Sequence, residues 1–186
     1  AFDAGVAAGI ALGVLQSDLV NVAGVAPIIL YHAESGKVFT VSGLGVWPKL
    51  VTPDYFQKRH GGKIPRGLLR TVVPAAPDAW IQTLQRWGSM SFGEVAAAAA
   101  RFAKEGFAAH PLLCETIATH RQGYEEWPSN RAIYLPNGRP PRVGEIFVQS
   151  DLANSLQYMI DEEWAAAGKG RHAALEAARA AFYTGD

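Results

Sequence analysis

The stretch AGVAPIILYHAESGKVFTVSGL, residues 23–44, decides the fold of this chain. It contains two apolar runs, 25–33 and 38–41, which are rich in the β-branched and aromatic residues that suit a strand. The polar residues 34–37 separate the runs, and Gly36 supplies the positive φ that a tight turn needs. The stretch therefore predicts a β-hairpin. Because the first run is apolar at nearly every position, we expect both faces of the hairpin to be buried between other layers.

The predicted hairpin leads into a loop of small and apolar residues. The residues of this loop are Ser42, Gly43, Leu44, Gly45, Val46 and Trp47. Glycines that follow a buried strand let a ligand approach the backbone closely, so the loop is a candidate binding wall. The alternative is that the glycines only turn the chain, and the residues alone leave both interpretations open.

Composition describes a globular chain of about one domain. The sequence has 186 residues, 49% of them hydrophobic, and its 17 basic residues balance 17 acidic ones. This balance predicts neither nucleic acid nor an anionic membrane as a partner. No apolar run reaches the roughly 18 residues needed to cross a bilayer, and the first residues lack the basic start of a signal peptide. We expect a cytoplasmic protein, with a periplasmic location as the alternative if a signal peptide has been removed.

The residues that could carry metal or nucleophilic chemistry are few and scattered. Cys114 is the single cysteine, and we interpret it as a small packed side chain rather than a nucleophile. His110 and His120 are too far apart to chelate, and no carboxylate lies at the spacing of a zinc site. The glycine-rich residues 61–67 lack the pattern of a phosphate-binding loop. The sequence therefore predicts no metal, no other cofactor and no self-contained catalytic set.

Helical patterns dominate the rest of the chain. Residues 2–16 are apolar on all sides, which predicts a helix buried nearly all round. Its Gly5, Gly9 and Gly13 form a stripe that we expect to press on the hairpin, because glycine permits close packing of backbones. Further helices are expected at 53–60, 75–87, 91–105, 110–123, 150–167 and 172–183.

Two of these helices start with recognisable caps. Thr52-Pro53 combines an N-cap hydroxyl with a proline at the first helical position, and Ser91 with Glu94 fits a capping box. A short strand is expected at 69–73, where Pro74 ends it. Residues 127–143 are rich in Pro, Asn, Gly and Arg, which predicts an irregular excursion over the surface.

The connection between the first helix and the hairpin, SDLVNVAG at residues 17–24, is polar at several positions. Asp18 and Asn21 are residues whose short side chains commonly bond local backbone groups in turns. The alternative is that Asn21 faces a ligand pocket. The residues alone leave both roles open.

Segments spread over nearly the whole chain resemble, in order, those of γ-glutamyltranspeptidases. The opening AFDAGVAA resembles the helix of that family with the pattern NA-x-DA-x-VAA. The other matching segments are the hairpin with Tyr31 and residues 35–38, Val73-Pro74, Trp87-Gly88, 103–107, 135–138, 143–144, 150–153 and 181–185. No single motif is decisive, but their shared order carries the resemblance.

The resemblance implies an α/β (α+β) fold, helix-rich with the hairpin buried in part of a four-layer αββα sandwich of N-terminal nucleophile hydrolases. Residues 1–186 would be a single domain, the large (alpha) subunit portion of a precursor that cuts itself. The nucleophile would be the N-terminal Thr of the small (beta) subunit, so no catalytic residue is expected in this chain. A dimer of such heterodimers is the assembly that the resemblance allows.

Departures from the family pattern bear on the substrate. The transpeptidase segment D-F-R-E-x-A-P has an Arg that grips the α-carboxylate of a γ-glutamyl group, and Leu44 stands at its place here. The glycine-rich oxyanion loop of the family is altered as well, and Asn21 lies at roughly that position. Arg70 either supplies a carboxylate contact from another direction or is a surface residue. The loop with Leu44 resembles the oxamate amidohydrolase branch more closely.

Two functions follow from these observations. The first is an autoprocessed amidohydrolase that hydrolyses a small amide without transferring a γ-glutamyl group; this chain would shape the pocket with Asn21, Arg70 and the loop from Ser42 to Trp47. The second is a noncatalytic relative that acts as a binding or scaffold protein. Loss of the family's Arg is compatible with both.

Overall fold

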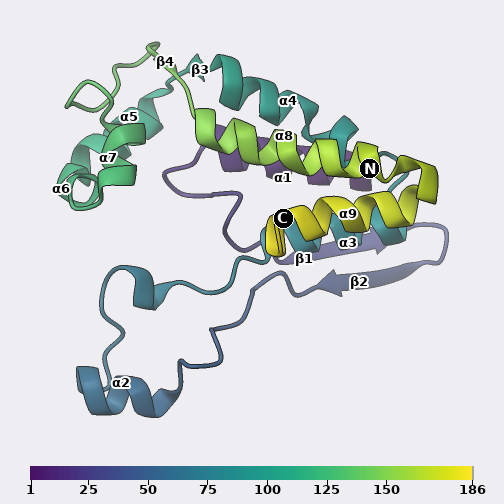
Figure 1. Cartoon of the computed structure of the whole chain (residues 1–186), viewed down its shortest axis with the longest axis horizontal. Coiled ribbons are helices and arrows are strands. Elements are labelled where there is room, and N and C mark those ends of the chain that lie inside the picture. Colours follow the sequence, from purple (N-terminus) through teal and green to yellow (C-terminus); the bar gives the residue numbers. More distant parts are fainter. Residues whose placement is uncertain (186) are drawn as a thin grey trace. The chain divides into compact units, whose positions relative to one another are not determined.

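The chain is described from a computed structural model, which covers residues 1–185 (Figure 1). It is helix-rich, with two small two-stranded sheets. Its elements are α1 (Phe2–Leu15), β1 (Ile28–His32), β2 (Lys37–Val41), α2 (Pro53–His60), η1 (Leu68–Arg70), α3 (Ala76–Trp87), α4 (Phe92–Glu105), β3 (Phe107–Ala108), α5 (Pro111–Thr119), α6 (Arg121–Glu125), α7 (Pro128–Tyr134), β4 (Ile146–Phe147), α8 (Ser150–Ala165), η2 (Ala167–Lys169) and α9 (Arg171–Tyr183).

The chain divides into two compact units. Unit 1 combines Ala1–Val22 with the residues from Ile81 onward, and unit 2 is Ala23–Trp80. The boundary between them falls inside α3. The prediction of a single domain stays a prediction.

The hairpin of unit 2 confirms the prediction from residues 23–44. β1 pairs antiparallel with β2, and Leu30 lies opposite Phe39 in the register. Leu30 and Val41 are buried, but Ile29 and Tyr31 are 76% and 61% exposed. The prediction that both faces are buried is therefore wrong for the described chain. Successive side chains of a strand point to opposite faces, and residues 1–185 cover one of the two.

The remainder of unit 2 agrees with the predicted cap and disagrees with the predicted strand. Thr52 accepts a hydrogen bond from Tyr55 N at the start of α2, and Gly61 ends this helix in the left-handed conformation. Residues 69–73 were expected to form a strand. They instead begin within η1 and continue as irregular chain, because the amides of Arg70 and Thr71 are bonded within the turn.

Unit 1 is built from packed helices. α4 contacts both α1 and α8, and α8 in turn contacts α9. The capping box of α4 is confirmed: Ser91 Oγ accepts from Glu94 N at 3.1 Å, and the Glu94 carboxylate accepts from Ser91 N at 2.7 Å. The buried Glu163 of α8 adds a second cap, since its two carboxylate oxygens accept the amides of Phe92 and Gly93, each at 2.7 Å. This carboxylate therefore fixes the start of α4 against α8.

Helix α1 forms as predicted, but its surroundings differ from the prediction. Ile10 and Val14 are buried, whereas Leu12 is 51% exposed, so the helix is not buried nearly all round. Gly13 packs closely against Val22, while a Cβ at Gly5 would have open space around it among the described residues. The packing of the glycine stripe on the hairpin stays a prediction, because α1 and the hairpin belong to different units. The close approach that Gly13 permits is to the connection that follows α1.

Three other parts of unit 1 differ from the sequence predictions. Residues 127–143 contain helix α7, with Pro128 at its first turn, so the prediction of an irregular segment throughout is wrong. The helix expected over 110–123 breaks at His120 into α5 and α6. The sheet of β3 and β4 was not predicted, because each strand has two residues and forms only through pairing with the other.

Candidate functional site

The loop after β2, residues 42–47, is held by backbone hydrogen bonds on both sides. Ala26 N donates to Gly43 O at 2.8 Å and thereby continues the register of the hairpin beyond β1 and β2. Val73 N donates to Val46 O, also at 2.8 Å. The loop therefore lies between two other segments of unit 2 and is tied to each by a peptide group.

Both glycines of the loop are required by this arrangement. Gly43 and Gly45 have φ angles of +53° and +72°. A Cβ at Gly43 would overlap the carbonyl oxygen of Ala26, and one at Gly45 would overlap that of Val73. The absence of a side chain at each glycine thus lets neighbouring backbone approach closely. The positive φ angles of the two glycines also turn the chain on either side of Leu44.

Leu44 is presented at the surface by these two anchored neighbours. Its side chain is 55% exposed, and Ser42 is exposed as well. Trp47 is half-buried and lies against Phe56 of α2, with ring centroids 5.1 Å apart. We call residues 42–47, the binding wall predicted from sequence, the strap. It carries the alkyl side chain of Leu44 at its centre and the ring of Trp47 at its end.

Arg70 belongs to the same unit as this strap. It ends η1, three residues before Val73, whose amide binds the strap. Its Nη2 donates to the carbonyl oxygen of Ile64 at 3.3 Å, and the residue is exposed. One nitrogen of the guanidinium is thus hydrogen-bonded to the backbone. The proposed contact of Arg70 with a substrate carboxylate stays a prediction.

Asn21 belongs to unit 1 and is exposed. The chain that leads to it is fixed by side chains from elsewhere in the unit. Gln149 Nε2 donates to Val14 O at 2.8 Å, and the Tyr134 hydroxyl donates to Ser17 O at 3.2 Å. His110 Nε2 lies 3.1 Å from the carbonyl oxygen of Leu15 and caps α5 through its Nδ1. These contacts hold the end of α1 and the start of the connection before Asn21.

The most perturbed tyrosines of the described chain lie around this connection. Burial, followed by the nearby Tyr134 and Asp18, raises the pKa of Tyr124 to about 12. The two tyrosine rings are 4.7 Å apart between centroids, and burial also raises the pKa of Tyr134. Among the described residues, Ser17 Oγ and Asp18 Oδ2 are buried without a hydrogen-bond partner. Both phenols therefore stay neutral at ordinary pH, and that of Tyr134 donates to Ser17 O.

Neither a catalytic nucleophile nor a metal centre is assembled in the described part of the chain. Burial raises the pKa of the half-buried Cys114 thiol, which disfavours the reactive thiolate. No group of three or more His, Cys, Asp or Glu residues within 1–185 is placed to hold a metal ion. In the same residues, no helix is long and apolar enough to span a membrane.

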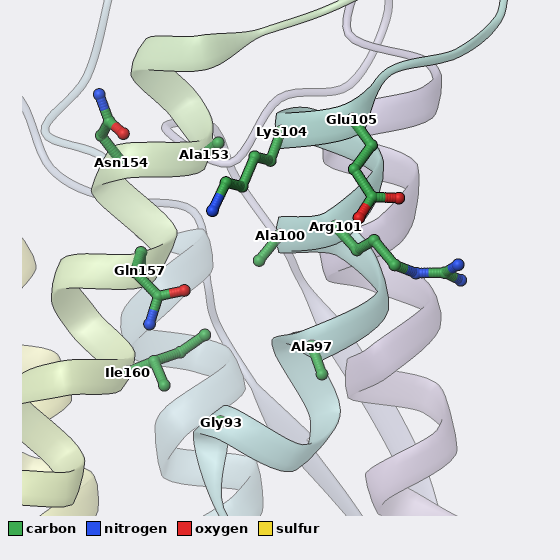
Figure 2. A pocket seen from close by; sticks show the side chains of 10 residues that line it. All are labelled: Gly93, Ala97, Ala100, Arg101, Lys104, Glu105, Ala153, Asn154, Gln157 and Ile160. Carbon is green, nitrogen blue, oxygen red and sulfur yellow. The ribbon is translucent and has the colours of Figure 1, made fainter.

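A groove between α4 and α8 was missed by the sequence analysis. It has a volume of about 360 Å³ and a floor of small residues that includes Ala97, Ala100 and Ala153. Figure 2 shows the Lys104 side chain extending into the space beside Gln157, while Arg101 points away. The alanine run within 95–100 is the only sequence signal for this groove, and it also fits simple helix packing. The predicted site residues line neither this groove nor its neighbour near Trp164.

The whole chain is similar to known proteins. A model of the family described as Gamma-glutamyltranspeptidase matches residues 1–186. The chain is 29% identical to the Glutathione hydrolase-like YwrD proenzyme of Bacillus subtilis (strain 168), covering 100% of this chain and 33% of that protein. It is 28% identical to the Acylase ACY 1 proenzyme of Pseudomonas sp. (strain V22), covering 87% and 31% respectively.

A solved structure is also similar over the whole chain. The structure of LmbA2991T421A superposes with a TM-score of 0.89 at 34% identity, covering 100% of this chain and 32% of that one. The chain thus spans about a third of the length of the relatives it matches.

Proposed function

Because the chain belongs to the gamma-glutamyltranspeptidase family, we propose that it is the large-subunit portion of an autoprocessed amidohydrolase. The relatives include proteins named as proenzymes of a glutathione hydrolase-like enzyme and of an acylase, which supports precursor cleavage and amide chemistry. An N-terminal Thr on the small subunit would attack the substrate carbonyl, with its own amino group as base. This chain would contribute part of the four-layer αββα sandwich and one wall of the pocket.

The observation that carries the proposed substrate class is Leu44. By the resemblance it would stand where the family pattern has the Arg that holds a γ-glutamyl carboxylate, and it is 55% exposed between two glycines whose backbones are anchored. An alkyl group offers no charge-assisted hydrogen bond to a carboxylate. We therefore propose hydrolysis of a small amide, as in the oxamate amidohydrolase branch, rather than γ-glutamyl transfer.

The first experiment determines the intact masses and N-terminal sequences of all polypeptides in the purified full-length protein. A small-subunit chain with a free N-terminal Thr is the expected result, and ammonia release is then screened across small amides. An uncut precursor, or a small chain that begins with another residue, would contradict the amidohydrolase and favour the noncatalytic binding or scaffold protein.

The second experiment tests the role of Leu44. The unmodified enzyme should hydrolyse a γ-glutamyl anilide far more slowly than its best small amide. Leu44→Arg should raise kcat/KM for the anilide by roughly tenfold or more, because a charged hydrogen bond to a carboxylate is worth about 1.5–3 kcal/mol. Leu50→Arg is the matched control, since Leu50 is 90% exposed in the same unit. Equal changes in kcat/KM for the two variants would show that Leu44 is not part of the pocket wall.

Arg70 is tested in the same assays. We propose that its guanidinium, held on one side by Ile64 O, meets an acidic group of the substrate. Arg70→Lys keeps the charge but loses the planar fork, so it should raise KM for anionic amides more than for neutral ones. Equal changes for both substrate types would make Arg70 a surface residue. The cytoplasmic location and the dimer of heterodimers stay proposals for the whole protein.

A further inference from the structure

One row of side chains follows helix α8 along the grooves of unit 1. We call it the α8 row, and its members are Ala153, Gln157, Ile160 and Trp164. They are four, three and four residues apart, so they share one face of the helix. Each of them lines the groove beside Lys104 or the groove beside Trp164, and Ile160 lines both. The Lys104 groove and the Trp164 groove therefore adjoin along this face.

Trp164 is the large apolar side chain of the α8 row, and it is 82% exposed. It lies at the edge of the Trp164 groove, whose volume is about 390 Å³. Burial of an indole ring withdraws roughly 150–250 Å² of surface from water. Tryptophan is also enriched among the residues that carry most of the binding energy of protein interfaces. The exposed ring beside a groove therefore indicates a surface for another protein.

The spacing of the α8 row reads the same in both directions. Two antiparallel copies of α8 can be related by a twofold axis that passes between Gln157 and Ile160. Trp164 of one copy then lies opposite Ala153 of the other, because these two positions are equally far from the axis. Ile160 lies opposite Gln157 for the same reason. A twofold interface requires a self-complementary surface, and this row pairs its largest side chain with its smallest.

The Lys104 groove offers room for the ring at that position. Its volume is about 360 Å³, and its floor consists of small residues that include Ala97, Ala100 and Ala153. Cavities of about 300–1,000 Å³ are those in which proteins enclose small organic ligands. Figure 2 shows the Lys104 side chain extending into the same space. Trp164 of a second copy would thus lie over the alanines with an ammonium group at its face, which is an attractive cation–π contact.

The charges of the two grooves are complementary in the same arrangement. The Lys104 groove is lined by two basic residues and one acidic residue, Arg101, Lys104 and Glu105. The Trp164 groove is lined by two acidic residues and one basic residue, Glu94, Glu163 and Arg171. An antiparallel twofold pair brings the Lys104 groove of one copy to the Trp164 groove of the other, so unlike charges meet.

We propose that the α8 row and its two grooves form a twofold interface between copies of this chain, with Trp164 of each copy seated in the Lys104 groove of the other. The proposal rests on the proposed function only in that each half would be a large and a small subunit; it uses none of the amide chemistry. Helices α4 and α8 have 14 and 16 residues, so their shared face is about 20 Å long and about 20 Å wide. Stable interfaces bury roughly 800 Å² on each partner. We therefore expect a dimer of heterodimers that dissociates on dilution.

A partner other than a second copy fits these grooves less well. Another protein, or the remainder of this one, could cover the grooves without any symmetry in the α8 row. A twofold axis requires that the spacing reads the same in both directions, that large faces small and that the charges of the two ends are opposite. The α8 row and its grooves meet all three requirements.

The first test measures self-association of the processed full-length protein by sedimentation velocity from roughly 1 to 100 µM. The mass should rise from one heterodimer to two as the concentration increases. Trp164→Ala should raise the dissociation constant by roughly a hundredfold or more, because each dimer loses two anchoring rings. Trp127→Ala is the matched control, since Trp127 is 41% exposed and lines neither groove. A constant mass of one heterodimer, or equal effects of the two substitutions, would overturn the proposal.

Photo-crosslinking keeps the proposal testable if Trp164→Ala fails to fold. The exposed Asn154 of the Lys104 groove is replaced by p-benzoylphenylalanine in the full-length protein, and ¹⁵N-labelled and unlabelled copies are mixed. Irradiation should give mixed-isotope products that join position 154 to the end of α8 in a second copy. The same group at Glu176, which is exposed on α9 and lines neither groove, should give little of this product. Links within one copy only, or links to residues outside 1–186, would overturn the interface.

The outcomes also distinguish this interface from the proposed function. A dimer that Trp164→Ala dissociates, in a sample without an N-terminal Thr, would retain the interface and remove the amidohydrolase. An N-terminal Thr with ammonia release, in a protein that has the mass of one heterodimer at every concentration, would retain the enzyme and remove the interface.

Discussion

The two segments predicted to face a substrate are supported in different ways. The chain that leads to Asn21 in unit 1 is held by side chains: Gln149 donates to Val14 O near the end of α1, and Tyr134 donates to Ser17 O in the connection. The strap around Leu44 in unit 2 is held by peptide groups, with Gly43 tied to the chain before β1. The first segment thus depends on residues distant in sequence, and the second depends on the absence of a side chain.

This difference determines which substitutions each segment tolerates. A strap held by backbone bonds keeps its shape when Leu44 changes, because the side chain takes no part in the bonds that hold it. A substitution at Leu44 therefore changes the group presented there without rebuilding the loop. The connection before Asn21 has no such freedom at its supports, since each supporting side chain satisfies a particular carbonyl oxygen.

The largest effect is expected from Gly43→Ala. The new Cβ would overlap Ala26 O at a residue with φ +53°, so both the strap and the chain before β1 must move. We expect the free energy of unfolding in urea to fall by roughly 3 kcal/mol, from strain of the left-handed backbone together with the overlap. Gly36→Ala is the control: its φ is +63°, but its Cβ meets nothing within 4 Å among the described residues.

The control should cost about 1 kcal/mol, the amount expected for a left-handed alanine alone. If Gly43→Ala and Gly36→Ala destabilise equally, then the close approach to Ala26 contributes nothing and the strap is not held as described. Circular dichroism of both variants during urea titration gives the two free energies.

A smaller loss is expected at the supports of the other segment. Gln149 is 6% exposed, and its Nε2 donates to Val14 O at 2.8 Å. Gln149→Leu keeps the approximate volume but leaves that carbonyl oxygen buried without its partner, which should lower the free energy of unfolding by about 2 kcal/mol. Gln157→Leu, in the helix α8 that follows Gln149, is the control and should change it by less than about 0.5 kcal/mol, because Gln157 is exposed. Equal losses would show that the buried amide is not a support.

The features predicted correctly from sequence are those whose interacting residues lie close together in the chain. The caps at Thr52 and Ser91 lie within three residues of the amides they bind, and both were predicted. Gly36 and the flanking apolar runs likewise gave the hairpin. Helix α7 was missed because its proline-rich surroundings suggested a loop, although Pro128 suits a first helical turn.

Parts of the site could not be predicted because their partners are distant in sequence. Residues 42–47 were recognised as a loop from their glycines, but the need for each glycine comes from Ala26 and Val73, which no local pattern identifies. The bond between Gln149 and Val14 joins residues 135 positions apart. The exposure of Ile29 and Tyr31 was also missed, because apolar residues on both sides of a strand predict burial of both.

A moderate effect is expected from Tyr134→Phe, which tests the support nearest to the connection. Loss of the hydroxyl removes the 3.2 Å hydrogen bond to Ser17 O and should cost about 1 kcal/mol. The change should also lower the pKa of Tyr124, because the charge of Tyr134 is one of the causes that raise it to about 12. Spectrophotometric titration of the phenols measures this shift, and an unchanged titration would place the two tyrosines in separate environments.

The same tyrosine pair predicts how stability depends on alkaline pH. The pKa of Tyr124 is raised in the folded state from 10 to about 12, so this state binds more protons than the unfolded state between those values. Its contribution to stability is present below pH 10 and is lost as the pH rises to about 12. The free energy of unfolding of Tyr124→Phe should therefore fall less steeply with pH over this range than that of the unmodified protein. Equal slopes would contradict the raised pKa.

The smallest effect is expected where a side-chain support is only half-buried, at the turn before β4. The Arg139 guanidinium donates to both oxygens of Glu145, at 2.9 and 3.1 Å, and Arg142 N donates to one of them at 2.8 Å. These bonds lower the pKa of Glu145 from 4.5 to about 2. Because the lowered pKa belongs to the folded state, the stabilisation is present above pH 4.5 and is lost as the pH falls to about 2.

Glu145→Gln removes the charge from this turn. It should accelerate hydrogen exchange at the Arg142 amide while leaving the urea midpoint almost unchanged, since an ion pair that solvent still reaches contributes little to global stability. Glu176→Gln is the control, because Glu176 pairs with Arg179 at 2.9 Å on the surface of α9 and contacts no part of the turn in the described bonds. A titration midpoint for Glu145 near 4.5, measured by carbon NMR, would mean that the arginine does not hold it. Side chains would then support unit 1 only where they are buried, as Gln149 is.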